Sequence, residues 1–446
     1  MKSIKLIVAF LLSSLLYAQE NEGKYAFTLE EAITHALENN YQAINASRGV
    51  DAAKKRKWET TTIGLPQINA NVNYQNNFVL QKSVVPAEFF GGNPGEFQEV
   101  EFGTKHNMTA NATLSQLIFD GSYLVGLQSA KVYLQISENA KEKTDIEIRE
   151  VVTNAYGNVL LANESVKVLE SNKKILDQTL FETQETFKNG LIEEENVEQL
   201  QITLSQINSS LSNAKRRSEI ALNMLKLVLG IDIEYELTLK DNLDELANKN
   251  IDLATLSSEF NVQENIDYKI SLNTQESNRL LLKLEKSKAL PNLAANLNFG
   301  YNSFSNEFSF LENDQKWFNY SNLGVALNIP VFSSLGRSAR TQQAKIAYEQ
   351  SKTQLKETEQ QLLLEYQTAR NDYEFSIEQY QVSKDNLLLA ERIERKQGVK
   401  FKEGISSSFE YTEAQRQLYA TQQTYLQSMI DVINKKTALD KIINKK

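Results

Sequence analysis

The sequence contains few side chains of the kinds that usually do chemistry. It has two histidines, His35 and His106, and no cysteine among its 446 residues. Neither histidine has a second ligand at metal-binding spacing, so no zinc or copper site is expected and both are interpreted as structural. No phosphate-binding loop, dinucleotide-binding fingerprint or nucleophile elbow occurs. We therefore predict that the protein is not an enzyme, needs no cofactor and takes its energy from a partner.

The amino-terminal residues have the pattern of a cleavable secretory signal. Lys2 and Lys5 precede an apolar run from Leu6 to Leu16, and Ala18 offers a cleavage point, which predicts a signal peptide over residues 1–18. The run is too short to span a bilayer as a helix, so a retained anchor is the weaker alternative. The lack of cysteine also excludes disulfides and a lipidated amino-terminal cysteine.

The overall composition excludes several classes of partner and fold. No later stretch approaches twenty consecutive apolar residues, and the mean hydropathy is −0.43, which excludes a bundle of membrane-spanning helices. The formal net charge of −9 disfavours nucleic acid as a partner, and it also disfavours anionic membrane surfaces.

The distribution of proline permits very long helices. The five prolines all lie at or before residue 94 or between residues 291 and 330, so 95–290 and the chain after 330 contain none. Apolar residues spaced three and four apart continue from Ser122 to Asn189, and the same pattern returns downstream around Tyr366 and Tyr373. An uninterrupted helix of this extent would be ~100 Å long, so such helices must pack side by side to be stable.

The segments near the prolines have the period of two that is typical of strands with one polar face. From Ile68 to Gln75, apolar residues alternate with asparagine or glutamine. We expect strands over about 66–80, 107–119, 291–301 and 320–332. Each is about as long as a tilted strand that crosses a membrane.

The chain consists of two copies of one structural unit. Leu65-Pro66 matches Leu290-Pro291, and the segment Phe187–Gly190 matches Phe401–Gly404. Each copy is predicted to contain a helix, two strands and a long helical hairpin. The first copy covers 19–230 and turns near 190, and the second covers 251–446 and turns near 404. Residues 231–250 interrupt the pattern and predict a small insert between the copies.

Four strands cannot close into a barrel on their own. Open sheet edges cannot face lipid, because each unpaired backbone group there costs several kcal/mol. A barrel shared between chains is therefore expected, and the polar strand faces suit a water-filled lumen. A soluble sandwich of four strands is the alternative, but the long helices offer no second layer of matching size.

Over about residues 24 to 442, the sequence resembles the TolC family of outer-membrane efflux factors. The second hairpin turn carries the resemblance most closely, in the pattern Phe401-x-x-Gly404-x-x-Ser407-x-x-Glu410, and the first turn is similar around Gly190 and Leu191. The resemblance implies a mainly helical fold with a trimeric twelve-stranded β-barrel in the outer membrane and a helical periplasmic tunnel. It also implies an exit duct for efflux or type I secretion, with a periplasmic adaptor and an inner-membrane transporter as partners.

The resemblance assigns roles to the two turns, called here the helical tips. Acidic residues six and nine positions after the second tip glycine line the entrance in this family, which implies a periplasmic gate at Glu410 and Glu413. Their spacing of three places both carboxylates on one helix face, and rings of carboxylates favour cations and repel one another. The alternative is two ordinary solvated glutamates. The residues implied to dock the adaptor are Gly190, Leu191, Ile192, Gly404, Ile405 and Ser406.

Two positions depart from the family pattern. Asn196 stands where an acidic residue is common, and Ser406 stands where a basic residue is common. A charge-pair latch between these positions is therefore not expected. The run 193–195 of three glutamates could replace the missing charge, although a solvated turn explains it as well.

Trp317, Phe318 and Tyr320 follow a polar loop and enter a predicted strand, which suits an aromatic girdle at the membrane interface. The alternative is an ordinary cluster at the start of a strand. For the whole protein, the alternative to an outer-membrane duct is a periplasmic coiled-coil scaffold or adaptor without a barrel.

Overall fold

The computed structural model describes residues 23–256 and 260–444, so the predicted signal peptide lies outside the described residues. The chain divides into two compact units. One, called here the sheet unit, comprises Asp51–Ile136 and Asn273–Thr353, and the other, the hairpin unit, holds the remaining described residues. Among the described residues, no helix combines the length and apolarity needed to cross a bilayer.

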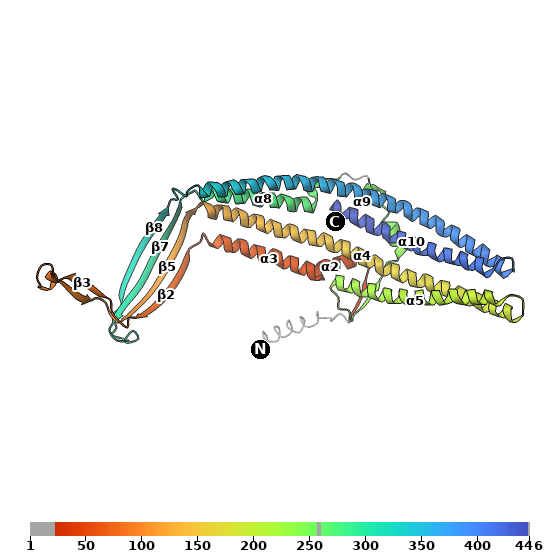
Figure 1. Cartoon of the computed structure of the whole chain (residues 1–446), viewed down its shortest axis with the longest axis horizontal. Helices are drawn as coiled ribbons and strands as arrows, with labels where there is room; N and C mark the ends of the chain where they lie inside the picture. The colour runs from red at the N-terminus through yellow and green to blue at the C-terminus, as the bar shows by residue number, and fades with distance from the viewer. Residues whose placement is uncertain (1–22, 257–259, 445–446) are drawn as a thin grey trace, which may run out of the picture. The chain divides into compact units, whose positions relative to one another are not determined.

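The sheet unit is built on one antiparallel sheet (Figure 1). Its strands are β2 (Gln67–Asn76), β5 (His106–Asp120), β7 (Asn292–Ser305) and β8 (Phe318–Asn328), in the order β2-β5-β7-β8. The central pair, β5 and β7, joins the two copies of the duplicated unit through 14 paired residues, with a register shift between Leu117 and Phe119.

The register sorts the side chains of the sheet into an apolar face and a polar face. One cross-strand row consists of Ile68, Leu114, Leu297 and Leu323. The adjacent row consists of Asn69, Thr113, Asn298 and Asn322. In this polar row, the Thr113 hydroxyl donates to Asn298 Oδ1 at 2.7 Å, and Asn298 Nδ2 donates to Asn322 Oδ1 at 2.9 Å. The period of two in the sequence therefore corresponds to two chemically different faces.

The first loop of the sheet contains a hairpin of its own. The strand expected over about 66–80 ends at Asn76, and the chain then forms β3 (Lys82–Pro86), the short 3-10 helix η2 (Ala87–Phe90) and β4 (Phe97–Glu101). In the part of the chain that the structure describes, strands β3 and β4 pair with each other and with no other strand. Near the end of β2, the Tyr74 hydroxyl lies 2.8 Å from Nδ1 of His106, the first residue of β5, so this histidine has a structural partner.

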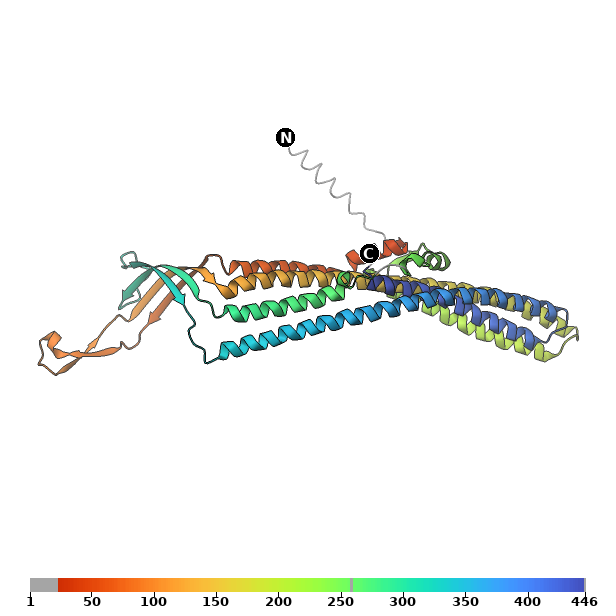
Figure 2. The ribbon, with the colours of Figure 1, turned by 90° about the horizontal axis from the view of Figure 1, so that it is seen from above.

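Four helices join the sheet at one end (Figure 2). Helices α3 (Tyr41–Thr62) and α8 (Ile266–Ser287) precede β2 and β7, whereas α4 (Gly121–Lys188) and α9 (Gly336–Lys402) follow β5 and β8. At the start of α4, the Asp120 carboxylate accepts hydrogen bonds from the backbone N–H groups of Ser122 and Tyr123, at 2.6 and 2.9 Å. An acidic cap of this kind satisfies amide groups that have no partner within the helix.

The hairpin unit contains two long helical hairpins. Helix α4 turns into α5 (Glu194–Leu229), and α9 turns into α10 (Ser408–Ile442). Their shared core is formed by side chains from all four helices, among them Val152, Tyr156, Leu225, Tyr373 and Ile430, each at most 1% exposed. The absence of proline from these stretches allows the backbone hydrogen bonds to continue along 68 residues of α4 and 67 of α9.

A small side element packs on these helices. Strands β1 (Lys24–Phe27) and β6 (Glu236–Leu239) pair in parallel, accompanied by α2 (Leu29–Asn39), α6 (Leu243–Lys249), α7 (Leu253–Leu256) and the 3-10 helix η3 (Val262–Glu264). Thr28 and Glu31 form a reciprocal capping box at the start of α2.

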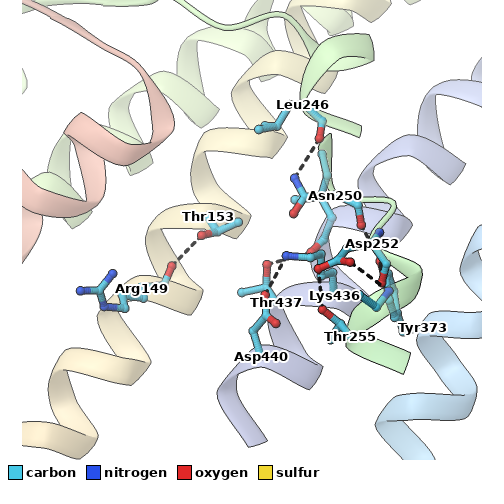
Figure 3. Close-up of polar contacts among 12 residues, drawn as sticks. Arg149, Thr153, Leu246, Asn250, Asp252, Thr255, Tyr373, Lys436, Thr437 and Asp440 are labelled. Atoms are coloured by element: carbon cyan, nitrogen blue, oxygen red, sulfur yellow. Dashed lines mark hydrogen bonds and ion pairs between the residues drawn. The ribbon is translucent and has the colours of Figure 1, made fainter. Parts of the chain in front are cut away.

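Two buried tyrosines attach the side element to the long helices. The Tyr156 hydroxyl lies 3.0 Å from the Phe27 carbonyl and 2.9 Å from the Asp241 carboxylate. The Tyr373 hydroxyl donates to the Asn250 carbonyl at 2.6 Å and accepts from the Asp252 N–H at 2.8 Å (Figure 3). Both rings are fully buried, so these bonds are shielded from water.

Candidate functional site

The two helical tips end in the same backbone turn. Gly190 and Gly404 have φ values of 73° and 71°, a conformation that side chains disfavour. The Leu191 N–H donates to the Thr186 carbonyl at 3.2 Å, and the Ile405 N–H donates to the Lys400 carbonyl at 2.8 Å. Each bond reaches back five residues, as in a Schellman motif. The tips lie side by side in both views of the chain (Figures 1 and 2).

The helices that leave the tips begin differently. Helix α10 begins with a capping box, in which the Ser407 hydroxyl accepts from the Glu410 N–H and the Glu410 carboxylate accepts from the Ser407 N–H at 3.0 Å. The Ser406 hydroxyl also donates to Glu410, at 2.7 Å. Helix α5 begins at Glu194, and its N-cap residue, Glu193, forms no side-chain cap. The capping box satisfies amide groups at the helix start that would otherwise lack partners.

The two glutamates implied to form a gate each have a partner within their own chain. Hydrogen bonds from the Ser406 hydroxyl and then from the Ser407 N–H lower the pKa of Glu410 below its ordinary value, so it stays ionised at neutral pH. Glu413 forms an ion pair of 2.9 Å with Arg416. Both glutamates are exposed on the first two turns of α10. The structure thus places both at the tip, but it turns Glu410 back toward its own helix cap.

Two polar contacts connect the first tip to the second. The Asn196 side-chain oxygen accepts from the backbone N–H of Ser408 at 3.3 Å, and Ser408 is buried. Lys402 pairs with Glu182 at 3.0 Å. Hydrogen bonding from Gln178 and then from Lys402 lowers the pKa of Glu182. Asn196 therefore connects the hairpins as a neutral acceptor, a role that its position in the sequence did not reveal.

A small apolar cluster lies behind these polar contacts. Leu176, Leu180, Val197, Leu200 and Ile207 from the first hairpin pack against Tyr411 from the second. The Tyr411 ring stacks on Phe401 with a centroid distance of 5.3 Å, and its hydroxyl donates to Glu394 at 3.2 Å. Burial, which is the main cause, raises the pKa of Tyr411 to about 12. The phenol thus remains neutral, joins the two hairpins through its packing, and is held by hydrogen bonding within the second hairpin.

The tips also present apolar side chains to solvent. Leu191 and Ile405, which occupy matching positions after the two glycines, are both 75% exposed. Phe409, one turn further on, is 58% exposed and was not singled out by the sequence. Ile192 and Ser406 are only partly exposed. Exposed apolar residues grouped at one end of a protein indicate an interaction surface.

The three aromatic residues expected at the membrane interface lie at the start of β8 and have separate neighbours. Trp317 packs edge-on against Phe310, Phe318 lies 6.3 Å from Phe304 between ring centroids, and Tyr320 covers Gly300. A Cβ on Gly300 would stand 2.8 Å from the Tyr320 ring. The girdle function of these side chains stays a prediction.

These features define a class of protein. It is a duplicated chain in which each copy supplies two strands to a sheet with an apolar and a polar face, and also supplies one long helical hairpin. Among the described residues, no cluster of three or more acidic, histidine or cysteine side chains could hold a metal ion.

Comparison with known proteins places the chain in a family. The family described as "outer membrane efflux protein" matches residues 32–231 and 275–445, one stretch for each copy of the duplicated unit. The chain therefore belongs to the outer membrane efflux protein family. It is a TolC-like, non-enzymatic efflux channel of the outer membrane, which confirms the predicted fold class and location and disfavours a periplasmic scaffold.

Individual relatives share the architecture at low identity. The outer membrane protein TolC of Vibrio cholerae is 20% identical over 409 residues, covering 92% of this chain and 89% of the relative. The structure of CusC has a TM-score of 0.75 at 17% identity, with 93% of this chain and 92% of the other covered. The CmeC outer membrane channel of Campylobacter jejuni has a TM-score of 0.71 at 17% identity, with coverage of 93% and 85%.

Proposed function

We propose that three copies of this chain form the exit duct of a tripartite efflux or type I secretion system. The observation that carries the proposal is the sheet with two open edges. Within residues 23–256 and 260–444, strands β2 and β8 each pair with one neighbour and no other, and all ten residues of β2 are exposed. Unpaired strand edges cannot face lipid, so each edge needs a partner from another chain.

The strand order supports closure by identical copies. Four consecutive antiparallel strands make β2 and β8 run in opposite directions. Strand β8 of one copy can therefore pair antiparallel with β2 of the next, and a rotation axis closes the ring. Three copies would give twelve strands, enough to leave a lumen, with the asparagine row facing water and the leucine row facing lipid.

We assign the helical tips two tasks within this duct. Leu191 and Ile405 are proposed to dock a periplasmic adaptor that belongs to an inner-membrane transporter, because both are apolar, exposed and in equivalent places. Glu410 and Glu413 are proposed to form charged rings at the entrance when three tips meet. Trp317, Phe318 and Tyr320 are proposed to lie at the outer membrane interface.

A pair of substitutions separates the charge of Glu410 from its capping function. Glu410→Gln removes the charge but keeps an acceptor that a capping box can use, whereas Glu410→Ala removes both. If a ring of charges gates the duct, single-channel recording of the purified trimer in a planar bilayer should show the same loss of cation preference in both variants. Glu413→Gln should show a similar loss.

Three results would contradict parts of this proposal. Absence of any conductance, even in the Glu410→Ala, Glu413→Ala double variant, would refute a gated pore. A change confined to Glu410→Ala would mean that Glu410 acts as a cap and not through its charge. Cross-linking that shows a species other than a trimer would refute the proposed closure.

A further inference from the structure

The helix ends that join the sheet carry an excess of positive charge in a chain that is acidic as a whole. Segments 51–66, 120–136, 273–291 and 329–353 contain 13 Lys and Arg residues and 6 Asp and Glu residues, although the chain has a net charge of −9. The rest of the sheet unit contains 3 Lys and Arg residues and 7 Asp and Glu residues, in the ranges 67–119 and 292–328. We call the cationic side chains of the four segments the basic belt.

The topology gathers these charges at one end of the sheet. Helices α3 and α8 lead into β2 and β7, whereas α4 and α9 follow β5 and β8. Because the strands are antiparallel, all four helices meet the same end of the sheet (Figure 1). Lys57 lies five residues before the end of α3, Lys286 lies one before the end of α8, and Arg340 lies four after the start of α9. At 1.5 Å per residue, these side chains begin within about 8 Å of the helix ends.

The densest part of the belt is on α3. Lys54, Lys55, Arg56 and Lys57 are consecutive and all exposed. Steps of 100° around a helix spread four consecutive residues over most of its circumference, so some of these cations project outward whichever side faces the lumen. Trp58, which follows them, is 61% exposed. Tryptophan beside lysine and arginine is typical of the membrane–water interface.

Several belt cations have no anionic partner among the described residues. Lys54 pairs with Asp51, and Arg56 lies over the ring of Tyr133. Within the described part of the chain, Lys55, Lys57, Lys131, Lys286 and Lys345 have no carboxylate within 4.0 Å. Unpaired exposed cations next to a bilayer attract anionic headgroups, by a factor of about five in affinity for each side chain.

We propose that the basic belt binds the phosphate headgroups of anionic phospholipids where the helices meet the outer membrane. The inference rests on the proposed placement of the sheet in the bilayer. The negative net charge of the chain predicts the opposite preference, but screening limits each charge to a range of about 8 Å at physiological salt, so the local excess decides. The opposite end of the sheet has more acidic than basic residues, so anionic lipid should bind at the helix end of the sheet and not at the opposite end.

The two tryptophans of the chain, Trp58 and Trp317, allow a local test. In a Trp317→Phe background, Trp58 is the only tryptophan and lies beside the belt. The protein is reconstituted in vesicles that contain an anionic lipid with a dansyl headgroup, and energy transfer from Trp58 is competed with unlabelled phosphatidylglycerol or phosphatidylcholine. Phosphatidylglycerol should compete at least about fivefold better at low salt, and this preference should disappear near 1 M NaCl.

Charge-removing variants identify the side chains responsible. Lys55→Gln, Lys57→Gln and Lys286→Gln together break no ion pair in the described chain and should strongly reduce the preference for phosphatidylglycerol over phosphatidylcholine. The matched control is Lys174→Gln, Lys249→Gln and Lys396→Gln, three exposed lysines of the hairpin unit, which should keep the preference. Inorganic phosphate at equal concentration should not compete, because the site needs headgroups held at the bilayer surface.

The possible failures are distinguishable. Equal competition by the two lipids in an inserted, conducting trimer, or a preference that the triple variant leaves unchanged, would overturn the lipid site but not the duct. A triple variant that alters the anion selectivity of conductance without altering lipid competition would place the cations in the lumen, and it too would overturn the lipid site. Failure of the protein to insert would overturn both the duct and the lipid site.

Discussion

The hydrogen bond from Ser408 to Asn196 should help to hold the duct closed. Asn196→Ala removes the acceptor and leaves the buried N–H at the start of α10 without its partner. A neutral hydrogen bond contributes about 1 kcal/mol, and this one is long at 3.3 Å. If one tip can open alone, the population of the open state relative to the closed state should rise about fivefold. If three tips must open together, the closed state loses about 3 kcal/mol of stabilisation, which corresponds to a roughly hundredfold rise in the relative population of the open state.

The opposite change should tighten the same contact. Asn196→Asp keeps the size of the side chain and places a negative charge at the amino-terminal end of α10, where a helix favours an anion by about 0.3–1 kcal/mol. The open probability of the purified channel in single-channel recordings should therefore fall for Asn196→Asp and rise for Asn196→Ala. At a pH low enough to protonate the new carboxyl group, the difference between Asn196→Asp and the unchanged protein should shrink.

The matched control is Asn189→Ala. The Asn189 side chain lies on the same tip and donates to the Glu185 carbonyl of its own helix at 2.7 Å, so its loss leaves the contact between hairpins intact. An Asn196→Ala channel that opens no more often than Asn189→Ala would refute this reasoning. Increases of similar size in both variants would show that general loosening of the tip, and not the bond to Ser408, controls opening.

Two further predictions concern the hairpin unit. Tyr156→Phe removes a buried hydroxyl that is hydrogen-bonded to Asp241 and should weaken the attachment of the side element by about 2 kcal/mol. This loss should appear as roughly thirtyfold faster hydrogen exchange in β6. The control, Tyr235→Phe at an exposed tyrosine, should leave hydrogen exchange unchanged. The pKa of Glu410 is lowered in the folded state, so its contribution to the cap is present above the ordinary value of 4.5 and is lost as the pH falls through the lower folded value. Hydrogen exchange at the start of α10 should accelerate only in that acid range, and Glu410→Gln should abolish the pH dependence; acceleration already near neutral pH would contradict the assignment.

Much of the architecture follows from local patterns. The long helices follow from apolar spacing without proline, and the tip turns follow from glycines that adopt positive φ. The alternation of asparagine with apolar residues defines strands whose faces differ in polarity, whatever strands lie beside them. The duplication is visible because the same turn chemistry occurs twice, and the family match follows it in two stretches.

Other features depend on groups far apart in the chain. The central pairing of β5 with β7 and the parallel pairing of β1 with β6 join distant segments, and no local propensity specifies which strands become neighbours. Strand β2 ends at Asn76, before the expected end near residue 80, and the chain then continues into the separate β3–β4 hairpin.

The site shows the same division between local and tertiary information. The sequence by itself determined that Glu410 and Glu413 share the first turns of a helix after a glycine turn, because helix periodicity and turn chemistry are local. Only the tertiary structure decided that Glu410 turns back to Ser407 and that Asn196 accepts from Ser408. Hydrogen-bond partners depend on which groups the packing of the two hairpins brings within about 3 Å. The basic belt has the same origin, because its lysines and arginines come from four segments that only the sheet topology gathers at one end.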